Sequence, residues 1–213
     1  MLISKSKKFI YIHVDRTGGT TFSKAFKKYT IFQWSHRFHM LCLSIFGEIP
    51  SIHLLKEQTA LSLRDKIGTE TYNSYFKFAM IRNPWEWLVS DYSYRQQYKV
   101  ATYHDIISKM TFEQYVKWKL LKKYDEIDPF NNNRGLSSWF TDESGNLLVD
   151  YVGRFENFSD EFQYFCQQIG VKATLPHLNQ SKFNDYRKFY TDELAVLVEQ
   201  YFKLDIETYG YKF

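Results

Sequence analysis

The sequence contains few of the residues that build specialised scaffolds. Its 213 residues include two cysteines, four prolines and nine glycines. Cys42 and Cys166 lie far apart along the chain, and no cysteine–histidine spacing matches a zinc site. A disulfide-stapled secreted scaffold and a structural zinc domain are therefore excluded, and a reducing compartment is expected.

Long hydrophobic runs and a strong excess of one charge are also absent. The longest apolar stretch, residues 38–46, is far too short to span a bilayer. The charged N-terminus runs into a strand-like segment without a small-residue cleavage site, so we expect a soluble protein without an export signal. The net charge of +4 is too small to indicate nucleic-acid binding, although it suits an anionic ligand.

The rest of the composition is that of a globular domain rich in aromatic side chains. Hydrophobic residues make up 44% and charged residues 24%, whereas aromatic residues reach 19%. Runs of buried type at residues 9–14 and 75–81 predict strands, and a helical pattern follows each of them. This alternation indicates an α/β fold with a central, largely parallel sheet flanked by helices. No linker divides the chain, so we expect one domain over residues 1–213.

Capping and turn residues place the remaining elements. Asn83 as an N-cap and Pro84 at the first helical position predict a helix that ends near Gln97. A capping-box pattern predicts a helix over residues 111–123. The other helices are expected at residues 22–29, 57–67, 159–169 and from 191 onward, with a strand at 147–152 and loops at 124–138 and 174–190.

A glycine loop, residues 15–21, joins the first strand to its helix. Its two glycines let backbone N–H groups approach an anion closely, and the helix N-terminus adds the positive end of a dipole. Thr20 and Thr21 supply hydroxyl donors, and Arg16 supplies a charge. This P-loop-like strand–loop–helix unit predicts a phosphate or sulfate site. No lysine follows the second glycine and no Walker B acid is evident, so a metal-dependent nucleotide hydrolase is disfavoured.

The second strand ends in another pair of anion-binding side chains. Arg82 lies at the end of the strand, and Ser90 lies nearly two turns into the following helix. A guanidinium can fork onto a phosphate, and a hydroxyl can complete the shell of donors. The alternative is that Arg82 pairs with a local carboxylate, Glu86 or Asp91.

Together these features resemble the sulfotransferases that use 3′-phosphoadenosine 5′-phosphosulfate (PAPS), in particular the carbohydrate O-sulfotransferase branch. Residues 13–21 resemble the family's 5′-phosphosulfate loop, and residues 78–90 resemble its 3′-phosphate motif. Residues 152–156, 175–182 and 209–213 resemble further shared blocks. The resemblance implies in-line transfer of a sulfuryl group from PAPS to a hydroxyl acceptor without a metal, leaving adenosine 3′,5′-bisphosphate (PAP).

The resemblance also implies the residues that hold the nucleotide. They are Arg16, Thr17, Gly18, Gly19, Thr20, Thr21, Arg82, Ser90, Arg154 and Lys182. The acceptor is expected to be a glycan or a small molecule, and no nucleic acid is involved. Relatives in eukaryotic secretory membranes carry an anchor that is not seen in this sequence, which implies either a cytoplasmic enzyme of bacterial or viral type or a shortened form of a longer protein.

The chain departs from the family pattern at three places. The family usually has Pro-Lys where this chain has Asp15 and Arg16, so Arg16 would take the role of the lysine at the leaving oxygen without its point-like geometry. A basic residue often stands at the position of Trp87, so we assign Trp87 no role in the site. Many relatives have a histidine about where Glu57 stands, which leaves the general base open.

The expected base is Glu57 or His53. Glu57 has the position in its favour, although it is equally a carboxylate that suits the first turn of a helix. His53 has the more suitable unperturbed pKa, about 6.5, although a packed histidine would look the same. His13 is expected to be a packed histidine. The other histidines are weaker candidates for the general base, and they are His36, His39 and His104.

Two other interpretations remain open. A non-catalytic nucleotide- or glycan-binding relative would keep binding and lack turnover, and a small-molecule kinase would require ATP and Mg²⁺. A basic stretch is either the solvated face of a helix or a contact for an anionic glycan. It comprises Lys117, Lys119, Lys122, Lys123 and Arg134.

Overall fold

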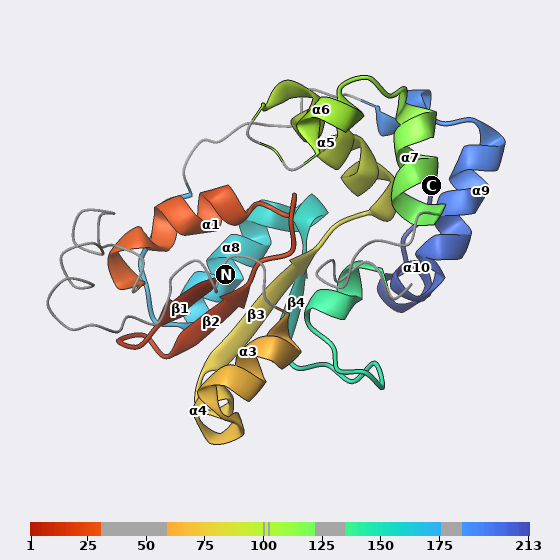
Figure 1. Ribbon diagram of the computed structural model, residues 1–213. Helices are drawn as coiled ribbons and strands as arrows, with labels where there is room; N and C mark the ends of the chain where they lie inside the picture. Colours follow the sequence, from red (N-terminus) through yellow and green to blue (C-terminus); the bar gives the residue numbers. More distant parts are fainter. Residues whose placement is uncertain (31–58, 100, 102, 122–134, 176–184) are drawn as a thin grey trace, which may run out of the picture. The chain divides into compact units, whose positions relative to one another are not determined.

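The computed structural model describes residues 1–30, 59–99, 101, 103–121, 135–175 and 185–213 (Figure 1). The chain divides into two compact units that are interleaved along the sequence. The first unit comprises residues 1–14, 18–80 and 139–177, and the second comprises residues 15–17, 81–138 and 178–213. That residues 1–213 form one domain stays a prediction.

The first unit contains a four-stranded sheet in the order β1-β2-β3-β4. Strand β2 (Phe9–Ile12) pairs in parallel with β3 (Phe76–Ile81), with Phe9 opposite Phe76 and Ile12 opposite Ala79. Both strands lie where the sequence predicts them. Strand β1 (Leu2–Ser4), which was not expected, pairs antiparallel to β2 at the edge. The α/β class is therefore confirmed.

The fourth strand lies later in the sequence than expected. It is β4 (Tyr151–Arg154), whereas the sequence pattern favours residues 147–152. At Leu147 the chain instead forms an isolated antiparallel bridge to Thr141 across the turn that begins at Asp142. Residues 147–152 are apolar except for Asp150, so composition alone does not show where pairing with the sheet begins.

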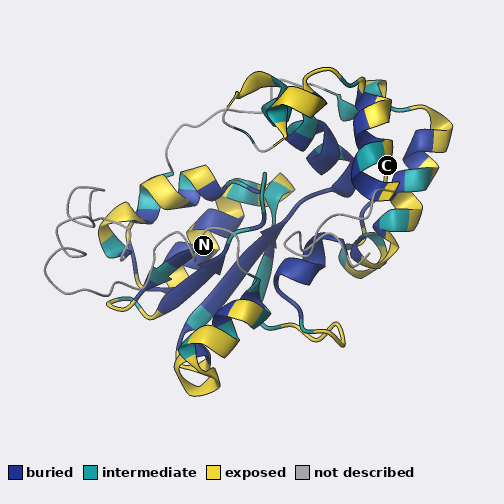
Figure 2. Cartoon of the chain, viewed as in Figure 1, coloured by how far each residue is buried: buried dark blue, intermediate teal, exposed yellow. Residues whose placement is uncertain are grey.

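Aromatic side chains cover one face of the sheet. Helix α1 (Gly19–Phe26), which a 3₁₀ turn (Lys27–Tyr29) extends, and helix α8 (Phe158–Gln168) pack against this face, as Figure 1 shows. Ring contacts join Phe22 of α1 and Phe165 of α8 to Phe78 of β3 at 5.5 and 4.5 Å between centroids. Figure 2 shows that β2 and β3 are buried along nearly their whole length, and this packing holds their ends in place.

Helix α3 (Ala60–Ile67) and helix α4 (Thr69–Asn73) precede β3 in the first unit. Thr59 caps α3 by accepting a hydrogen bond from the backbone of Ser62. Residues 57 and 58, where the sequence places the start of this helix, lie outside the described residues. Among the described helices, none is both long enough and apolar enough to cross a membrane.

The second unit is built from helices. Helix α5 (Pro84–Gln97) has Asn83 as its cap and Pro84 as its first residue, as predicted. Helix α6 (His104–Ile107) leads to α7 (Phe112–Leu121), where Thr111 and Gln114 form the predicted capping box.

The terminal helix, expected to be continuous, is broken at Phe202. It forms α9 (Asp192–Tyr201) and α10 (Lys203–Tyr209), and Thr191 caps the first of these as expected. Two segments expected to be loops contain 3₁₀ helices, Leu136–Trp139 and Tyr186–Phe189.

Candidate functional site

In the first unit, the glycine loop packs so closely that it has no room for side chains. Gly18 has a φ of +88°, and a Cβ added there would lie 2.2 Å from the ring of Phe158. A Cβ on Gly19 would lie 1.9 Å from Nε2 of His13. His13 is a packed histidine, as expected, since its ring also stacks on Tyr11. Both glycines are therefore required by the fold of the loop itself.

Helix α1 begins three residues earlier than predicted, directly after Gly18. The carbonyl of Gly18 accepts hydrogen bonds from the backbone of Thr21 and Phe22, at 2.9 and 3.2 Å, and so starts the helix. Thr20 and Thr21 therefore lie in the first turn. Within the described residues, no side chain caps this helix and its first turn carries no acidic residue. The N-terminus thus has the N–H donors and the positive dipole end that favour an anion.

Replacing Gly18 with alanine is expected to lower the free energy of unfolding by about 2–4 kcal/mol. The left-handed backbone costs about 1 kcal/mol with a Cβ, and forcing a methyl group into the ring of Phe158 adds about 1–3 kcal/mol. Urea denaturation measures the loss. Gly145→Ala is the matched control, because Gly145 has a φ of +85° but open space around it. Equal losses in the two variants would contradict the close packing of the loop.

In the second unit, Arg16 adopts an unusual conformation. Its φ is +62°, in the left-handed region that non-glycine residues rarely adopt. Its guanidinium carbon lies 4.2 Å from the centre of the Tyr94 ring. Nε of Arg16 is buried and has no hydrogen-bond partner among the described residues. Burial and, less strongly, the charge of Arg82 lower the pKa of Arg16, whereas Asp91 opposes this shift.

Arg82 is almost completely buried and contacts the loop. Its Nη1 donates to the carbonyl of Arg16 at 3.1 Å, and its Nη2 donates to Glu86 at 2.7 Å. The pairing with a local carboxylate, which the sequence left open, is therefore present. Ser90 is half-buried one helical turn beyond Glu86, on the same face of α5. The structure thus brings Arg16 and Arg82 into contact, and Ser90 and the fully buried Thr17 belong to the same unit.

Trp87 anchors the same loop, although the sequence analysis gave it no role. It is fully buried, and its indole N–H donates to the carbonyl of Asp15 at 2.7 Å. Trp87 and Arg82 therefore hold consecutive carbonyls, those of Asp15 and Arg16. This contact could not be predicted from the sequence, because a tryptophan where the family often has a basic residue is also typical of a hydrophobic core.

Asp91, a buried carboxylate, follows Ser90 in the sequence and is contacted by three hydrogen-bond donors. Arg95 Nε lies 2.9 Å away, Lys119 Nζ 3.1 Å and the Tyr115 hydroxyl 2.5 Å. Burial alone would raise the pKa of Asp91, but the two cations outweigh it and hold that pKa well below its usual range. Asp91 is therefore a charged structural centre beneath the site.

This network corrects the expectation of a solvated basic face on α7. Lys119 is only 8% exposed, and its charge is directed at Asp91. Lys117 does lie on the exposed face, where it pairs with Glu113 at 2.6 Å. The remaining basic residues of the stretch, Lys122, Lys123 and Arg134, lie outside the described residues.

The other predicted site residues either have the contacts given below or lie outside the described residues. Arg154 ends β4 in the first unit, and its Nε lies 3.7 Å from Glu156. The ring of His104 bonds to the carbonyl of Arg95 at 2.7 Å, which is a structural contact. The predicted residues that lie outside the described part are Glu57, His53, His36, His39 and Lys182.

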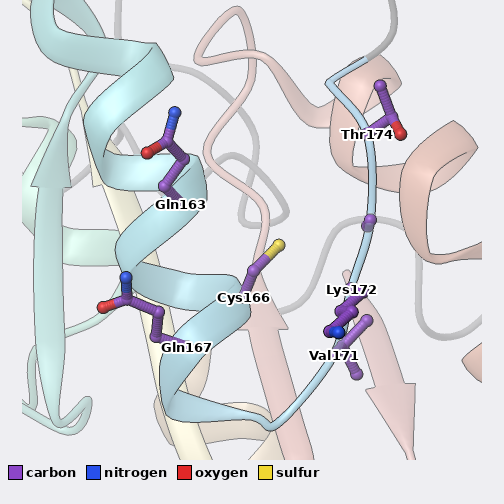
Figure 3. Close-up of a pocket in the computed structure, with 7 residues that line it drawn as sticks. Gln163, Cys166, Gln167, Val171, Lys172 and Thr174 are labelled. Atoms are coloured by element: carbon purple, nitrogen blue, oxygen red, sulfur yellow. The ribbon is translucent and has the colours of Figure 1, made fainter.

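A hollow of about 360 Å³ lies elsewhere in the first unit, beside α8. Gln163, Cys166 and Gln167 of this helix line the hollow together with residues 171–174, and Figure 3 shows the thiol of Cys166 pointing toward this extended segment. Burial raises the pKa of the Cys166 thiol, so it is a poor nucleophile at neutral pH. None of the predicted site residues lines this hollow.

Comparisons with known proteins show the family of this chain. The model of the sulfotransferase family matches residues 1–212, and the chain therefore belongs to this family, whose members transfer a sulfuryl group and normally use PAPS. A protein from Archaeoglobus fulgidus, described only as an uncharacterized protein, is 25% identical over 136 residues. The match covers 61% of this chain and 97% of that relative. No solved structure gives a significant match.

Proposed function

We propose that the protein is a PAPS-dependent O-sulfotransferase that transfers the sulfuryl group to a hydroxyl of a carbohydrate. The observation that carries this proposal is the pairing of two cations in one partly buried place. Arg82, which also pairs with Glu86, contacts the carbonyl of Arg16, and burial and, less strongly, the charge of Arg82 lower the pKa of Arg16 against the opposing charge of Asp91. Such a concentration of positive charge with little solvent favours a ligand that carries several negative charges.

The residues present fit the phosphate and sulfate groups of PAPS. The backbone N–H groups at the start of α1 have no side-chain cap, and Nε of Arg16 is a buried donor without a partner among the described residues. We assign the 5′-phosphosulfate to residues 16–21 and the 3′-phosphate to Arg82 and Ser90. Arg154 and Lys182 are the further nucleotide contacts in this proposal.

The proposed reaction breaks one S–O bond and forms another. The acceptor oxygen attacks sulfur in line, the bond from sulfur to the bridging oxygen of PAPS breaks, and PAP leaves with that electron pair. Arg16 and the N–H groups at the start of α1 stabilise the negative charge that grows on the leaving phosphate. Donors that tighten as this charge grows lower the barrier, because they bind the transition state better than the substrate. The reaction needs no metal ion.

The acceptor proton passes to Glu57 in this mechanism, with His53 as the second candidate. Replacing Glu57 with glutamine is expected to lower kcat by about 10²-fold, the usual contribution of a general base. The Kd for PAP should stay unchanged, because the base contacts the acceptor. Steady-state kinetics and calorimetry measure the two effects. Glu70→Gln, an exposed residue of α4, serves as the control, and near-normal turnover of Glu57→Gln would assign the base to His53.

The proposed activity is tested by incubating the protein with PAPS, EDTA and a panel of carbohydrates and small alcohols. Mass spectrometry follows the sulfated product, and chromatography follows PAP. The proposal predicts that both form in equal amounts and that Arg16→Ala abolishes their formation. PAP that binds tightly while no acceptor is sulfated would instead make the protein a non-catalytic relative that binds nucleotide or glycan.

A further inference from the structure

Arg16 stands where the family pattern usually has a lysine, and its side chain lies against an aromatic ring. A planar guanidinium can lie flat on an aromatic ring, whereas an ammonium is a compact point charge on a flexible stem. The guanidinium of Arg16 lies 4.2 Å from the centre of the Tyr94 ring. The replacement of lysine by arginine thus coincides with an aromatic partner for its side chain.

The backbone of Arg16 is fixed from the same helix. Trp87 binds the carbonyl of Asp15 at 2.7 Å, and Arg82, directly before α5, binds the carbonyl of Arg16 at 3.1 Å. These contacts hold the left-handed φ of +62° that a free chain would leave. Because the backbone is fixed, the side chain is what must be oriented.

Tyr94 provides the aromatic ring that the Arg16 guanidinium contacts in the described part of the chain. Among the nearby charges, Asp91 attracts the guanidinium and Arg82 repels it, and the carboxylate of Asp91 also accepts from Arg95, Lys119 and Tyr115. The Tyr94 ring is itself fixed by Tyr98, whose centre lies 4.8 Å away. In the described part of the chain, the hydroxyl of Tyr94 has no hydrogen-bond partner, so its action depends on the ring.

We propose that Tyr94 is a positioning residue for sulfuryl transfer. Its ring holds the guanidinium of Arg16 in the orientation from which Arg16 donates to the bridging oxygen as the S–O bond breaks. Tyr94 does not contact the reacting atoms, so its effect reaches the reaction through Arg16 alone. This inference rests on the proposed function.

The test compares Tyr94→Leu and Tyr94→Phe with wild type, using the hydroxyl acceptor that wild type sulfates. Tyr94→Leu should lower kcat by about 10-fold, the range of a partly buried cation–π contact, while the KM for PAPS and the Kd for PAP change less than about 3-fold. Tyr94→Phe should restore kcat, because it keeps the ring. Tyr164→Leu, which removes a ring exposed on α8, is the control.

A double-mutant cycle identifies the residue through which Tyr94 acts. Arg16→Lys should lower kcat, and adding Tyr94→Leu to it should cause little further loss, since an ammonium gains less from the ring. The inference would be overturned if the losses of kcat in the double mutant were additive. It would also be overturned if Tyr94→Phe lost as much kcat as Tyr94→Leu, or if Tyr94→Leu changed only the KM. If wild type transfers no sulfuryl group, the proposed function fails first. If wild type is active and Tyr94→Leu matches it, only the inference fails.

Discussion

Replacing Arg82 with alanine is expected to weaken the binding of PAP by about 10³-fold. In the proposed assignment, Arg82 donates two charge-assisted hydrogen bonds to the 3′-phosphate, each worth about 1.5–3 kcal/mol, and the variant loses both. The carbonyl of Arg16 also loses the donor that holds it at 3.1 Å, so the loop that receives the 5′ end is loosened. Titration calorimetry in EDTA measures the Kd of both proteins.

Two further variants make this result specific. Arg187 is an exposed arginine of the same unit, and its Nη1 lies 3.8 Å from Asp185. Arg187→Ala should therefore leave the Kd for PAP unchanged. Arg82→Lys keeps the charge while losing the fork, so it should bind PAP with an affinity between those of wild type and Arg82→Ala. A Kd for Arg82→Ala within about 3-fold of wild type, in a protein that still unfolds cooperatively, would refute the 3′-phosphate assignment.

Asp91→Ala is expected to lower the free energy of unfolding by about 3–5 kcal/mol, the cost of leaving buried charges without their partner. Lys119 and Arg95 would remain beneath the site without the carboxylate that both contact. Urea denaturation at neutral pH measures the change. Asp65→Ala is the control, because Asp65 is exposed and its contact with Arg64 is 3.7 Å long. A loss in Asp91→Ala no larger than that in Asp65→Ala would contradict the network.

The same carboxylate also gives stability a dependence on pH. The pKa of Asp91 in the folded protein is depressed below its value in the unfolded chain, about 3.9. Its contribution is therefore fully present above about pH 4 and is lost as the pH falls from there through the folded-state pKa. Between about pH 6 and pH 3, wild type should lose more stability than Asp91→Asn. Parallel curves would show that Asp91 does not titrate in this way.

The elements that the sequence predicts well are those with local signals. Asn83 and Pro84 determine the start of α5 by bonds to neighbouring residues, and Thr111 with Gln114 does the same for α7. β1 has only three residues and no local signal. The early start of α1 depends on the conformation of Gly18, which is sterically linked to Phe158, 140 positions away in the sequence.

The residues of the candidate site show the same difference between local signals and contacts that are distant in the sequence. The glycine loop and Arg82 could be proposed as site residues from the sequence, because their spacing from the strands is a local property, and their role in binding stays a prediction. Trp87 and Tyr94 could not, since they act on residues more than 70 positions earlier. Lys119 was misplaced because helical periodicity cannot show that a buried lysine has Asp91 as its partner.

The central claim is that this fold binds the nucleotide of sulfuryl transfer, and calorimetry of the wild-type protein tests it most directly. PAP and ATP are titrated separately in the presence of EDTA. The account predicts tight, metal-free binding of PAP and binding of ATP at least about 10-fold weaker, because only PAP offers a 3′-phosphate to Arg82 and Ser90. Equal or tighter binding of ATP, or binding of PAP only when Mg²⁺ is added, would contradict the account and favour a small-molecule kinase.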